Sequence, residues 1–268
     1  MNLNDYFDTT DERPLDRPVT DGGYAGIFRT VAFVGDSLSS GEFEAIDADG
    51  NKTYHDYYDY SWGQYMARMA GFTAYNFSRG GMTAREYCDS FAEERGFWNP
   101  DLAAQAYVVA LGVNDVLNQG HEVGTMADIC DEDWHKNTNT FVGRYGEIIQ
   151  RYREIRPDGY FFLMTMPKGD RGKGPDAEKE AIADRHAELL YEMAAHFPNT
   201  YVLDLRKYAV EYDEAFREKF FLGGHMNPAG YILTAKMVLS YMDFIIRHNM
   251  DDFKQVGFIG TPFRWRPV

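Results

Sequence analysis

The sequence predicts an α/β protein built on a parallel sheet, because short apolar runs alternate with helix-like segments along the chain. Five such runs occur, and each is bounded by residues that favour turns. Strands that are buried on both faces, as in parallel sheets, read as almost continuous apolar stretches. Together these observations predict a three-layer α/β/α sandwich around a five-stranded parallel sheet.

The expected strands are apolar and rich in β-branched or aromatic residues, and they cover 30–34, 73–76, 106–111, 160–166 and 201–204. The expected helices lie between and after them, at about 61–71, 83–95, 141–155, 177–196 and 227–248. Two remaining segments are expected to be irregular. Residues 41–60 are polar and tyrosine-rich, and 116–137 are acidic.

Helix boundaries are marked by capping residues and prolines. Ser61 and Gln64 have the spacing of a capping box, in which two side chains satisfy free N–H groups of the first turn. Pro157 ends the helix at 141–155, because the residue before a proline disfavours the helical conformation. Asn227 is a favourable N-cap, and Pro228 suits the first helical position.

No linker or repeat divides the chain, so one main domain is expected over 29–250. Residues 1–28, with Pro14 and Pro18, are predicted to form an N-terminal arm. Residues 251–268 are predicted to form a C-terminal tail that packs on the same domain.

Composition excludes several classes of protein. The chain has 268 residues, with 27 Lys and Arg against 42 Asp and Glu, so its formal net charge is −15. This charge argues against nucleic acid or an anionic membrane as a partner. No uninterrupted apolar run approaches the roughly 18 residues of a membrane span, and the acidic N-terminus lacks the apolar core of a signal peptide. A cytoplasmic location is therefore expected.

The cysteine count adds to this expectation. Cys88 and Cys130 are the only cysteines, too few for a disulfide framework or a zinc site. We expect both to be reduced thiols without a chemical role, and we expect neither a metal nor a cofactor.

Polar and glycine-rich blocks stand where the predicted strands end, and ligands bind at the carboxyl edge of such sheets. The blocks are Gly35-Asp36-Ser37, Asn76-Phe-Ser-Arg-Gly80-Gly81, Gly112-Val-Asn114-Asp115 and, before the last helix, Gly223-Gly224-His225-Met-Asn227-Pro228. Acyl transfer requires a nucleophile, a base and hydrogen-bond donors for the developing oxyanion. A serine can supply the nucleophile and a histidine the base. Glycine and asparagine together can supply the donors for the oxyanion.

These four blocks, in this order, resemble those of the SGNH (GDSL-type) hydrolases over Val31 to about Tyr231. The resemblance implies a flavodoxin-like sandwich and a serine ester hydrolase that needs no metal. It further implies Ser37 as the nucleophile and His225 as the base. The oxyanion hole would consist of the Ser37 N–H, the Gly81 N–H and the Asn114 side chain.

One position departs from the pattern of that family, which normally has an aspartate three residues before the histidine. Here that position is Leu222. A neutral imidazole that presents one nitrogen to the serine needs an acceptor for its other N–H. A backbone carbonyl, of Leu222 or a loop neighbour, could accept this bond. Alternatively, a carboxylate could do so, and the nearest upstream candidates are Asp213, Glu214 and Glu218. We predict the carbonyl, and hence a Ser37–His225 dyad.

The range of the SGNH family implies a small acyl ester as substrate, with an acetyl group on a carbohydrate as the first candidate. The aromatic stretch 54–62 follows the nucleophile loop and could stack on a sugar, although Trp62 is expected to pack at the helix start. Lys168, Arg171 and Lys173 could attract an acidic substrate or simply be solvated.

Two other functions are compatible with the same residues. One is a lipase or thioesterase of the same family. The other is a non-catalytic binding module that kept the fold after losing the acid. The oligomeric state is left open by the sequence.

Overall fold

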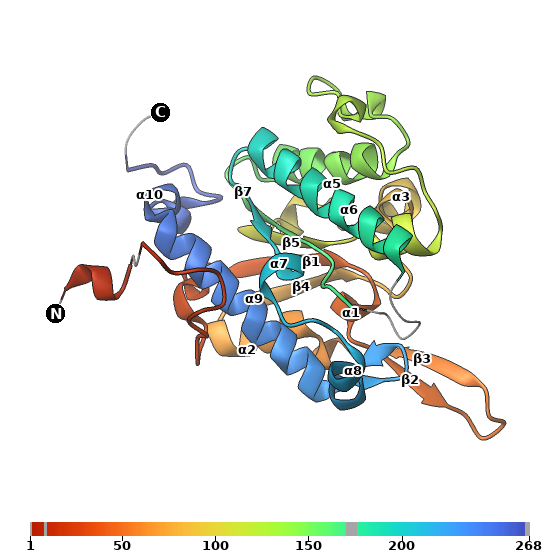
Figure 1. Cartoon of the computed structure of the whole chain (residues 1–268). Coiled ribbons are helices and arrows are strands. Elements are labelled where there is room, and N and C mark those ends of the chain that lie inside the picture. Colours follow the sequence, from red (N-terminus) through yellow and green to blue (C-terminus); the bar gives the residue numbers. More distant parts are fainter. Residues whose placement is uncertain (1, 8–9, 170–175, 266–268) are drawn as a thin grey trace.

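The structure, a computed structural model, describes residues 2–7, 10–169 and 176–265. Five parallel strands form one sheet in the order β4-β1-β5-β6-β7 (Figure 1). Their bounds are β1 Thr30–Gly35, β4 Thr73–Ser78, β5 Ala106–Ala110, β6 Tyr160–Met164 and β7 Thr200–Leu203. Helices flank this sheet, which confirms the predicted α/β fold class and the five-stranded parallel sheet.

The α-helices are α1 Ser37–Ser40, α2 Trp62–Ala70, α3 Ala84–Glu86, α4 Ala92–Glu94, α5 Phe141–Ile155, α6 Ala177–His196, α7 Leu205–Tyr208, α8 Glu214–Phe220, α9 Pro228–His248 and α10 Met250–Phe253. The helices predicted at 141–155 and 177–196 have the same bounds as α5 and α6. The one predicted over 83–95 is divided, because a π-helical turn at Tyr87–Phe91 separates α3 from α4. Two antiparallel pairs complete the fold, β2 Glu42–Ile46 with β3 Lys52–Asp56, and β8 Phe221–Leu222 with β9 His225–Met226.

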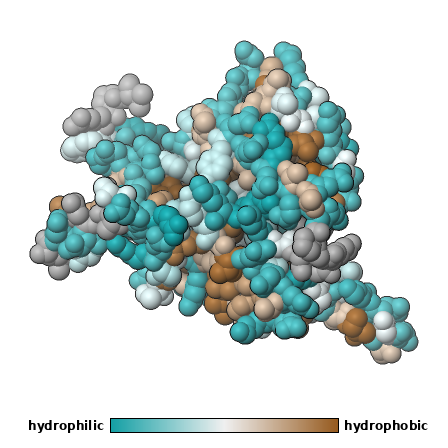
Figure 2. Space-filling view, viewed as in Figure 1, coloured by the Kyte–Doolittle hydropathy of each residue, from teal (hydrophilic) through white to brown (hydrophobic). Residues whose placement is uncertain are grey.

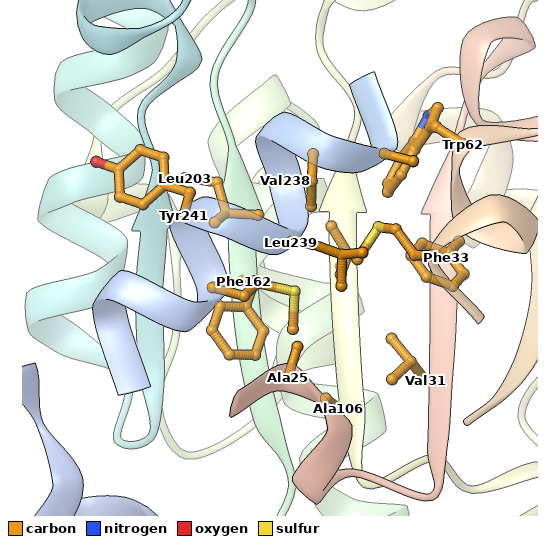
Figure 3. Packing of buried hydrophobic residues seen from close by; sticks show 14 of the residues in the cluster. Ala25, Val31, Phe33, Trp62, Ala106, Phe162, Leu203, Val238, Leu239 and Tyr241 are labelled. Atoms are coloured by element: carbon orange, nitrogen blue, oxygen red, sulfur yellow. The ribbon is translucent and has the colours of Figure 1, made fainter. Parts of the chain in front are cut away.

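Alternation along each strand divides the core into two apolar layers. Val31 and Phe33 of β1 belong to the layer that includes α2 and α9, which Figure 3 shows from close by. Ala32 and Val34 belong to the opposite layer, which includes α5 and α6. Because both faces of the sheet are covered, its strands are apolar at nearly every position.

The predicted caps position the helices against this core. Ser61 Oγ accepts a hydrogen bond of 3.1 Å from Gln64 N at the start of α2. The Gln64 side chain does not complete the predicted capping box, because Ser61 N donates to Tyr58 O at 2.8 Å. Trp62 then lies edge-on to Phe33, with ring centroids 4.9 Å apart, and is only 1% exposed. Its packing role is therefore confirmed. Asn227 Oδ1 accepts from Gly230 N at 2.9 Å and caps α9.

Both chain ends pack beside α9. The buried guanidinium of Arg247 pairs with Glu12 at 2.7 Å and with Asp243 at 2.7 Å. The N-terminal segment thus runs along this helix, as Figure 1 shows. At the other end of the chain, Phe253 stacks on Tyr160, with ring centroids 4.7 Å apart.

By length and hydropathy alone, α9 could cross a membrane. The lack of a long uninterrupted apolar run in the sequence did not predict this. However, 72% of its most apolar window is buried inside the structure. A helix that covers the centre of a sheet needs this composition. Packing in the core therefore explains the hydropathy of α9.

The segment 41–60, predicted as a loop, instead contains the hairpin β2–β3, which projects from the body of the protein (Figure 1). Its turn includes Asp49 and Gly50, and Gly50 has a φ of +84°, which favours glycine. The surface in Figure 2 is mostly hydrophilic, with a small apolar area on the projecting hairpin, where Ile46 is 64% exposed. The alternation of polar and apolar residues with an Asp-Gly turn is a hairpin signal that the expectation of a loop overlooked.

Asp115 joins the loops that follow β4 and β5. Its side chain is completely buried, and Oδ1 accepts a hydrogen bond of 2.9 Å from Ala84 N. Oδ2 has no hydrogen-bond partner among the described residues. Burial raises the pKa of Asp115 to about 7. The carboxyl group therefore keeps its proton in the folded state at pH values where the unfolded chain has lost it.

This raised pKa predicts that Asp115 contributes less stability as the pH rises. An unfolded aspartate ionises near pH 4, so the folded state loses up to about 4 kcal/mol of relative stability between about pH 4 and 7. Asp115→Asn cannot ionise and keeps an oxygen for Ala84 N–H. The melting temperature of the variant relative to wild type should therefore increase from about pH 4.5 to about pH 7.5. A difference that stays constant over this range would contradict the assignment.

Candidate active site

Ser37, Gly81, Asn114 and His225 line one cavity of about 460 Å³ at the carboxyl edge of the sheet. Ser37 follows β1, Gly81 follows β4 and Asn114 follows β5, and β1 lies between the other two strands. The chain passes from β1 to β4 on one side and then to β5 on the other. Such a reversal opens a crevice at the strand ends, where ligands bind in open α/β sheets.

Ser37 is the first residue of the single-turn helix α1. The Asp36 side chain caps this turn by accepting a hydrogen bond of 3.1 Å from Leu38 N. Gly41, with a φ of +79°, ends the helix after one turn. Ser39 and Ser40 are buried. Of the three serines in this turn, Ser37 lines the cavity.

The two further expected oxyanion donors lie together beside Ser37. Gly81 has a φ of +73°, a conformation that favours glycine. The Asn114 side-chain amide donates to Met82 O at 3.1 Å, and its oxygen accepts from Asn118 Nδ2 at 2.8 Å. These bonds direct the NH₂ group of Asn114 toward the loop that contains Gly81. The backbone around Asn114 is a π-helical turn, a feature frequently found at functional sites.

The acceptor for His225 Nδ1 is the carboxylate of Glu44, whose Oε1 lies 3.0 Å away. The same oxygen accepts from Gly224 N at 2.7 Å, and Oε2 accepts from Lys52 Nζ at 2.9 Å. The Glu44 side chain is only 9% exposed. Three donors therefore hold a nearly buried carboxylate against the imidazole ring.

The predicted carbonyl-based dyad is therefore wrong, as are the four candidates for the orienting group. Leu222 is paired with His225 across the β8–β9 turn, and its side chain is 49% exposed. Asp213 caps α8 through Phe216 N. In the described part of the chain, neither Glu214 nor Glu218 contacts the His225 ring.

Sequence reasoning missed Glu44, because all the candidates for the orienting group were close to the histidine in the chain. Glu44 lies 181 positions earlier in the chain. In β2, alternate side chains point to opposite sides, so Glu42 and Glu44 share one side and Phe43 occupies the other. The Phe43 ring packs against aromatic rings of the body, those of Tyr57, Tyr60 and Tyr231. The Glu-Phe-Glu pattern is the signal that could have identified the acid.

Glu42 meets the other side of the imidazole ring, with Oε1 2.9 Å from His225 Nε2. Its side chain is 12% exposed. A Cβ atom added at Gly80 would lie 1.9 Å from Glu42 Oε2, so the glycine leaves room for the carboxylate in this conformation. Between the described Ser37 and His225 there is no hydrogen bond. In this conformation Glu42 occupies the nitrogen that would serve the nucleophile.

The two carboxyl groups have opposite pKa shifts. Burial acts to raise the pKa of Glu44, but hydrogen bonds from Lys52, His225 and Gly224 outweigh it and hold the pKa below its ordinary value. Burial raises the pKa of Glu42, and the negative charges of Asp56 and Glu44 add to this effect against the opposing charge of His225. The surroundings thus favour the anionic form of Glu44 and disfavour the anionic form of Glu42.

Three cationic side chains, those of Lys168, Lys179 and Arg217, also line the cavity. The ring of Tyr54, which is outside this lining, lies edge-on to His225, with centroids 5.9 Å apart, and is 55% exposed. Arg171 and Lys173, the other two expected cations, lie outside the described residues.

Both cysteines are free, and burial raises the pKa of the Cys88 thiol well above its ordinary value. Within 2–7, 10–169 and 176–265, no three His, Cys, Asp or Glu side chains are grouped so that they could hold a metal ion.

Comparisons with known proteins identify the family and the fold. The profile of the GDSL-like lipase/acylhydrolase family matches residues 33–233. A search of curated protein sequences gave no match.

Among solved structures, a family two carbohydrate esterase from Clostridium thermocellum, in complex with cellohexaose, superposes with a TM-score of 0.56 at 15% identity, over 88% of this chain and 66% of that one. A protein from Lactobacillus plantarum gives a TM-score of 0.56 at 17% identity, over 81% and 97% of the two chains. Est24, a carbohydrate acetylesterase from Sinorhizobium meliloti, gives 0.54 at 15% identity, over 81% and 99%. At these identities the likeness shows a shared fold.

Proposed function

Because the chain belongs to the GDSL-like lipase/acylhydrolase family, we propose that it is a serine ester hydrolase that acts on small acyl esters. An acetyl group on a carbohydrate is the first candidate substrate. One observation carries the proposal: Ser37, Gly81, Asn114 and His225 line one cavity, and a carboxylate orients the histidine. The carbohydrate esterases of the same fold and the exposed Tyr54 beside His225 support the substrate class.

In the proposed reaction, Ser37 Oγ attacks the ester carbonyl carbon while His225 Nε2 takes its proton. The carbonyl oxygen becomes an oxyanion, which accepts hydrogen bonds from Ser37 N, Gly81 N and Asn114 Nδ2. The bond to the alcohol then breaks, and the imidazolium returns its proton to the leaving oxygen. Water releases the acyl group from Ser37 by the same steps. Throughout, Glu44 accepts the Nδ1–H bond and stabilises the imidazolium.

Glu42 must give way during this cycle. An N···O distance of 2.9 Å between an imidazole and a carboxyl group implies a proton between them. That proton belongs either to an imidazolium facing a carboxylate or to a carboxylic acid facing a neutral imidazole. In either case Nε2 cannot accept the serine proton until Glu42 moves. We infer that a bound ester displaces Glu42 and exposes Nε2 to Ser37.

The alternative of a non-catalytic module rested on the missing acid before the histidine. Glu44 supplies a carboxylate from another part of the chain, which removes the reason for that alternative. Ser37→Ala tests the difference, because it removes the nucleophile at a half-buried position that contributes little to the core. It should abolish hydrolysis of nitrophenyl acetate and leave the melting temperature nearly unchanged. A fluorophosphonate probe should label wild type at Ser37 only, and a fully active Ser37→Ala variant would refute the mechanism.

Glu44→Gln should lower kcat on the order of 100-fold, because a neutral amide orients the ring but cannot stabilise the imidazolium charge. Glu214→Gln on α8 is the matched control, since Glu214 is exposed and does not contact the ring. Both variants should be measured with nitrophenyl acetate, together with thermal unfolding. A Glu44→Gln rate within about twofold of the control would exclude Glu44 as the orienting acid.

Glu42→Gln should have a different effect, because it removes the carboxyl group that occupies His225 Nε2. A neutral amide binds the ring nitrogen less strongly than a carboxyl group does, so a bound ester should displace it more readily. The variant should therefore keep kcat/KM for nitrophenyl acetate or raise it by up to about fivefold, whereas Glu44→Gln lowers kcat. A loss as large as that of Glu44→Gln would show that Glu42 does more than cover Nε2.

A further inference from the structure

We propose that the ester hydrolysed at this site carries a carboxylate of its own, bound by a cationic wall formed by Lys168, Lys179 and Arg217. The three side chains line the cavity that contains Ser37 and His225. This inference rests on the proposed function, because it specifies the substrate class of the same site.

The cationic wall is built from three separate elements that the fold holds together. Lys168 follows β6, Lys179 lies in the first turn of α6 and Arg217 lies in α8. The loop after β6 is joined to the segment before α8 by a hydrogen bond of 2.8 Å from Tyr212 N to Lys168 O. A parallel bridge between Gly169 and Tyr212 continues this connection. Lys168 and Arg217 therefore lie on backbone segments that are fixed relative to each other.

Tyr212 anchors this connection in the core. It is 8% exposed and stacks on Phe216, with ring centroids 4.2 Å apart. Phe216 immediately precedes Arg217, so the same packing fixes the start of the Arg217 side chain. The Arg217 guanidinium lies 4.6 Å over the Phe221 ring and donates to Gly223 O at 3.3 Å. An aromatic ring and a carbonyl thus position this group without neutralising its charge.

In a protein with net charge −15, the ion pairs of Lys168, Lys179 and Arg217 decide how much of their positive charge is available to a ligand. Buried arginines elsewhere in the chain are paired, such as Arg206 with Glu180 and Asp184. By contrast, no carboxylate of the described residues lies within 4.0 Å of the charged groups of Lys168 or Arg217. Lys179 has only a contact of 3.5 Å with Asp176, and both side chains are more than 40% exposed. Such exposed pairs contribute little and exchange readily.

The acidic groups of the cavity are already engaged. Glu42 faces His225 Nε2, and Asp36 accepts hydrogen bonds from Leu38 N and, at 3.5 Å, from Asn114 Nδ2. The charge that remains available to a ligand is therefore positive and lies on the side of β6 and α8. A carboxylate there can accept from the planar fork of an arginine and from a lysine ammonium group. A neutral ester would gain no such interaction with these cations.

The test compares pairs of esters in which one member carries a carboxylate and the other carries a neutral hydroxymethyl or methyl ester group in its place. One arm uses acetylated glucuronic acid against acetylated glucose, which places the carboxylate on the alcohol. The other arm uses nitrophenyl hydrogen adipate against nitrophenyl methyl adipate, which places it on the acyl chain. In at least one arm, wild type should favour the anionic ester in kcat/KM by about five- to fiftyfold. This preference should weaken between about 20 mM and about 500 mM NaCl, because salt screens partly exposed charges.

Substitutions in the cationic wall then test whether the wall causes the preference for the anionic ester. Lys168→Gln and Arg217→Gln should each reduce the ratio of kcat/KM for the anionic over the neutral ester by about three- to tenfold. Lys219→Gln is the matched control, since it removes the same charge from an exposed position on α8 that does not line the cavity. The control should leave the ratio within about twofold of wild type.

The outcomes separate this inference from the proposed function. Equal or faster hydrolysis of the neutral ester in both arms overturns the cationic wall and leaves the hydrolase intact. A preference that Lys219→Gln reduces as much as Lys168→Gln and Arg217→Gln also overturns it, because the effect would then come from overall charge. If wild type hydrolyses none of the four esters or nitrophenyl acetate, the proposed function fails, and this inference fails with it.

Discussion

The contact between Glu44 and His225 is the interaction on which the geometry of this site depends. It connects the β2–β3 hairpin to the turn between β8 and β9, and Gly224 N–H joins the same carboxylate oxygen. One nearly buried anion thus fixes both the tautomer of the imidazole and the position of the loop that carries it. Without a negative charge at this point, Nδ1–H would lack a charged acceptor. The turn that contains two consecutive glycines would also lose its main restraint.

This arrangement changes which part of the chain supplies the catalytic machinery. An aspartate three residues before the histidine would place acid and base on one loop. Here the proposed nucleophile and acid lie on one short segment, from Ser37 to Glu44, and the histidine arrives from the far end of the chain. The packing of Phe43 against Tyr57, Tyr60 and Tyr231 consequently becomes a determinant of the site, because it fixes the hairpin that presents Glu44. The acid that contacts the histidine therefore depends on an element of structure that is remote from it in the chain.

The sequence predicted the features of the fold and site that depend on local patterns. It did not predict the features that depend on contacts between residues far apart in the chain. Apolar runs identified the strands, and polar residues at their ends identified Ser37, Gly81 and Asn114 as neighbours, which the common cavity bears out. The predicted carbonyl partner of His225 was wrong, because nothing local to His225 indicates a carboxylate 181 positions away. The hairpin had a local signal in its Asp-Gly turn, but the tyrosine-rich composition suggested a loop. The sequence likewise does not show which lysine and arginine side chains have no carboxylate beside them, because packing decides this.

The two glutamates of β2 show how strand alternation can place similar residues in different electrostatic roles. Both face the same ring, yet Lys52 and the Gly224 N–H neutralise Glu44, whereas Glu42 has only the imidazole and lies near two other carboxylates. Groups whose surroundings push their pKa values apart can divide acid and base functions between them. In the proposed mechanism, Glu44 at Nδ1 orients the imidazole, and Glu42 at Nε2 covers it until a substrate displaces that side chain. The hairpin therefore both orients the histidine and covers it, so that Nε2 becomes available to Ser37 only in an occupied site.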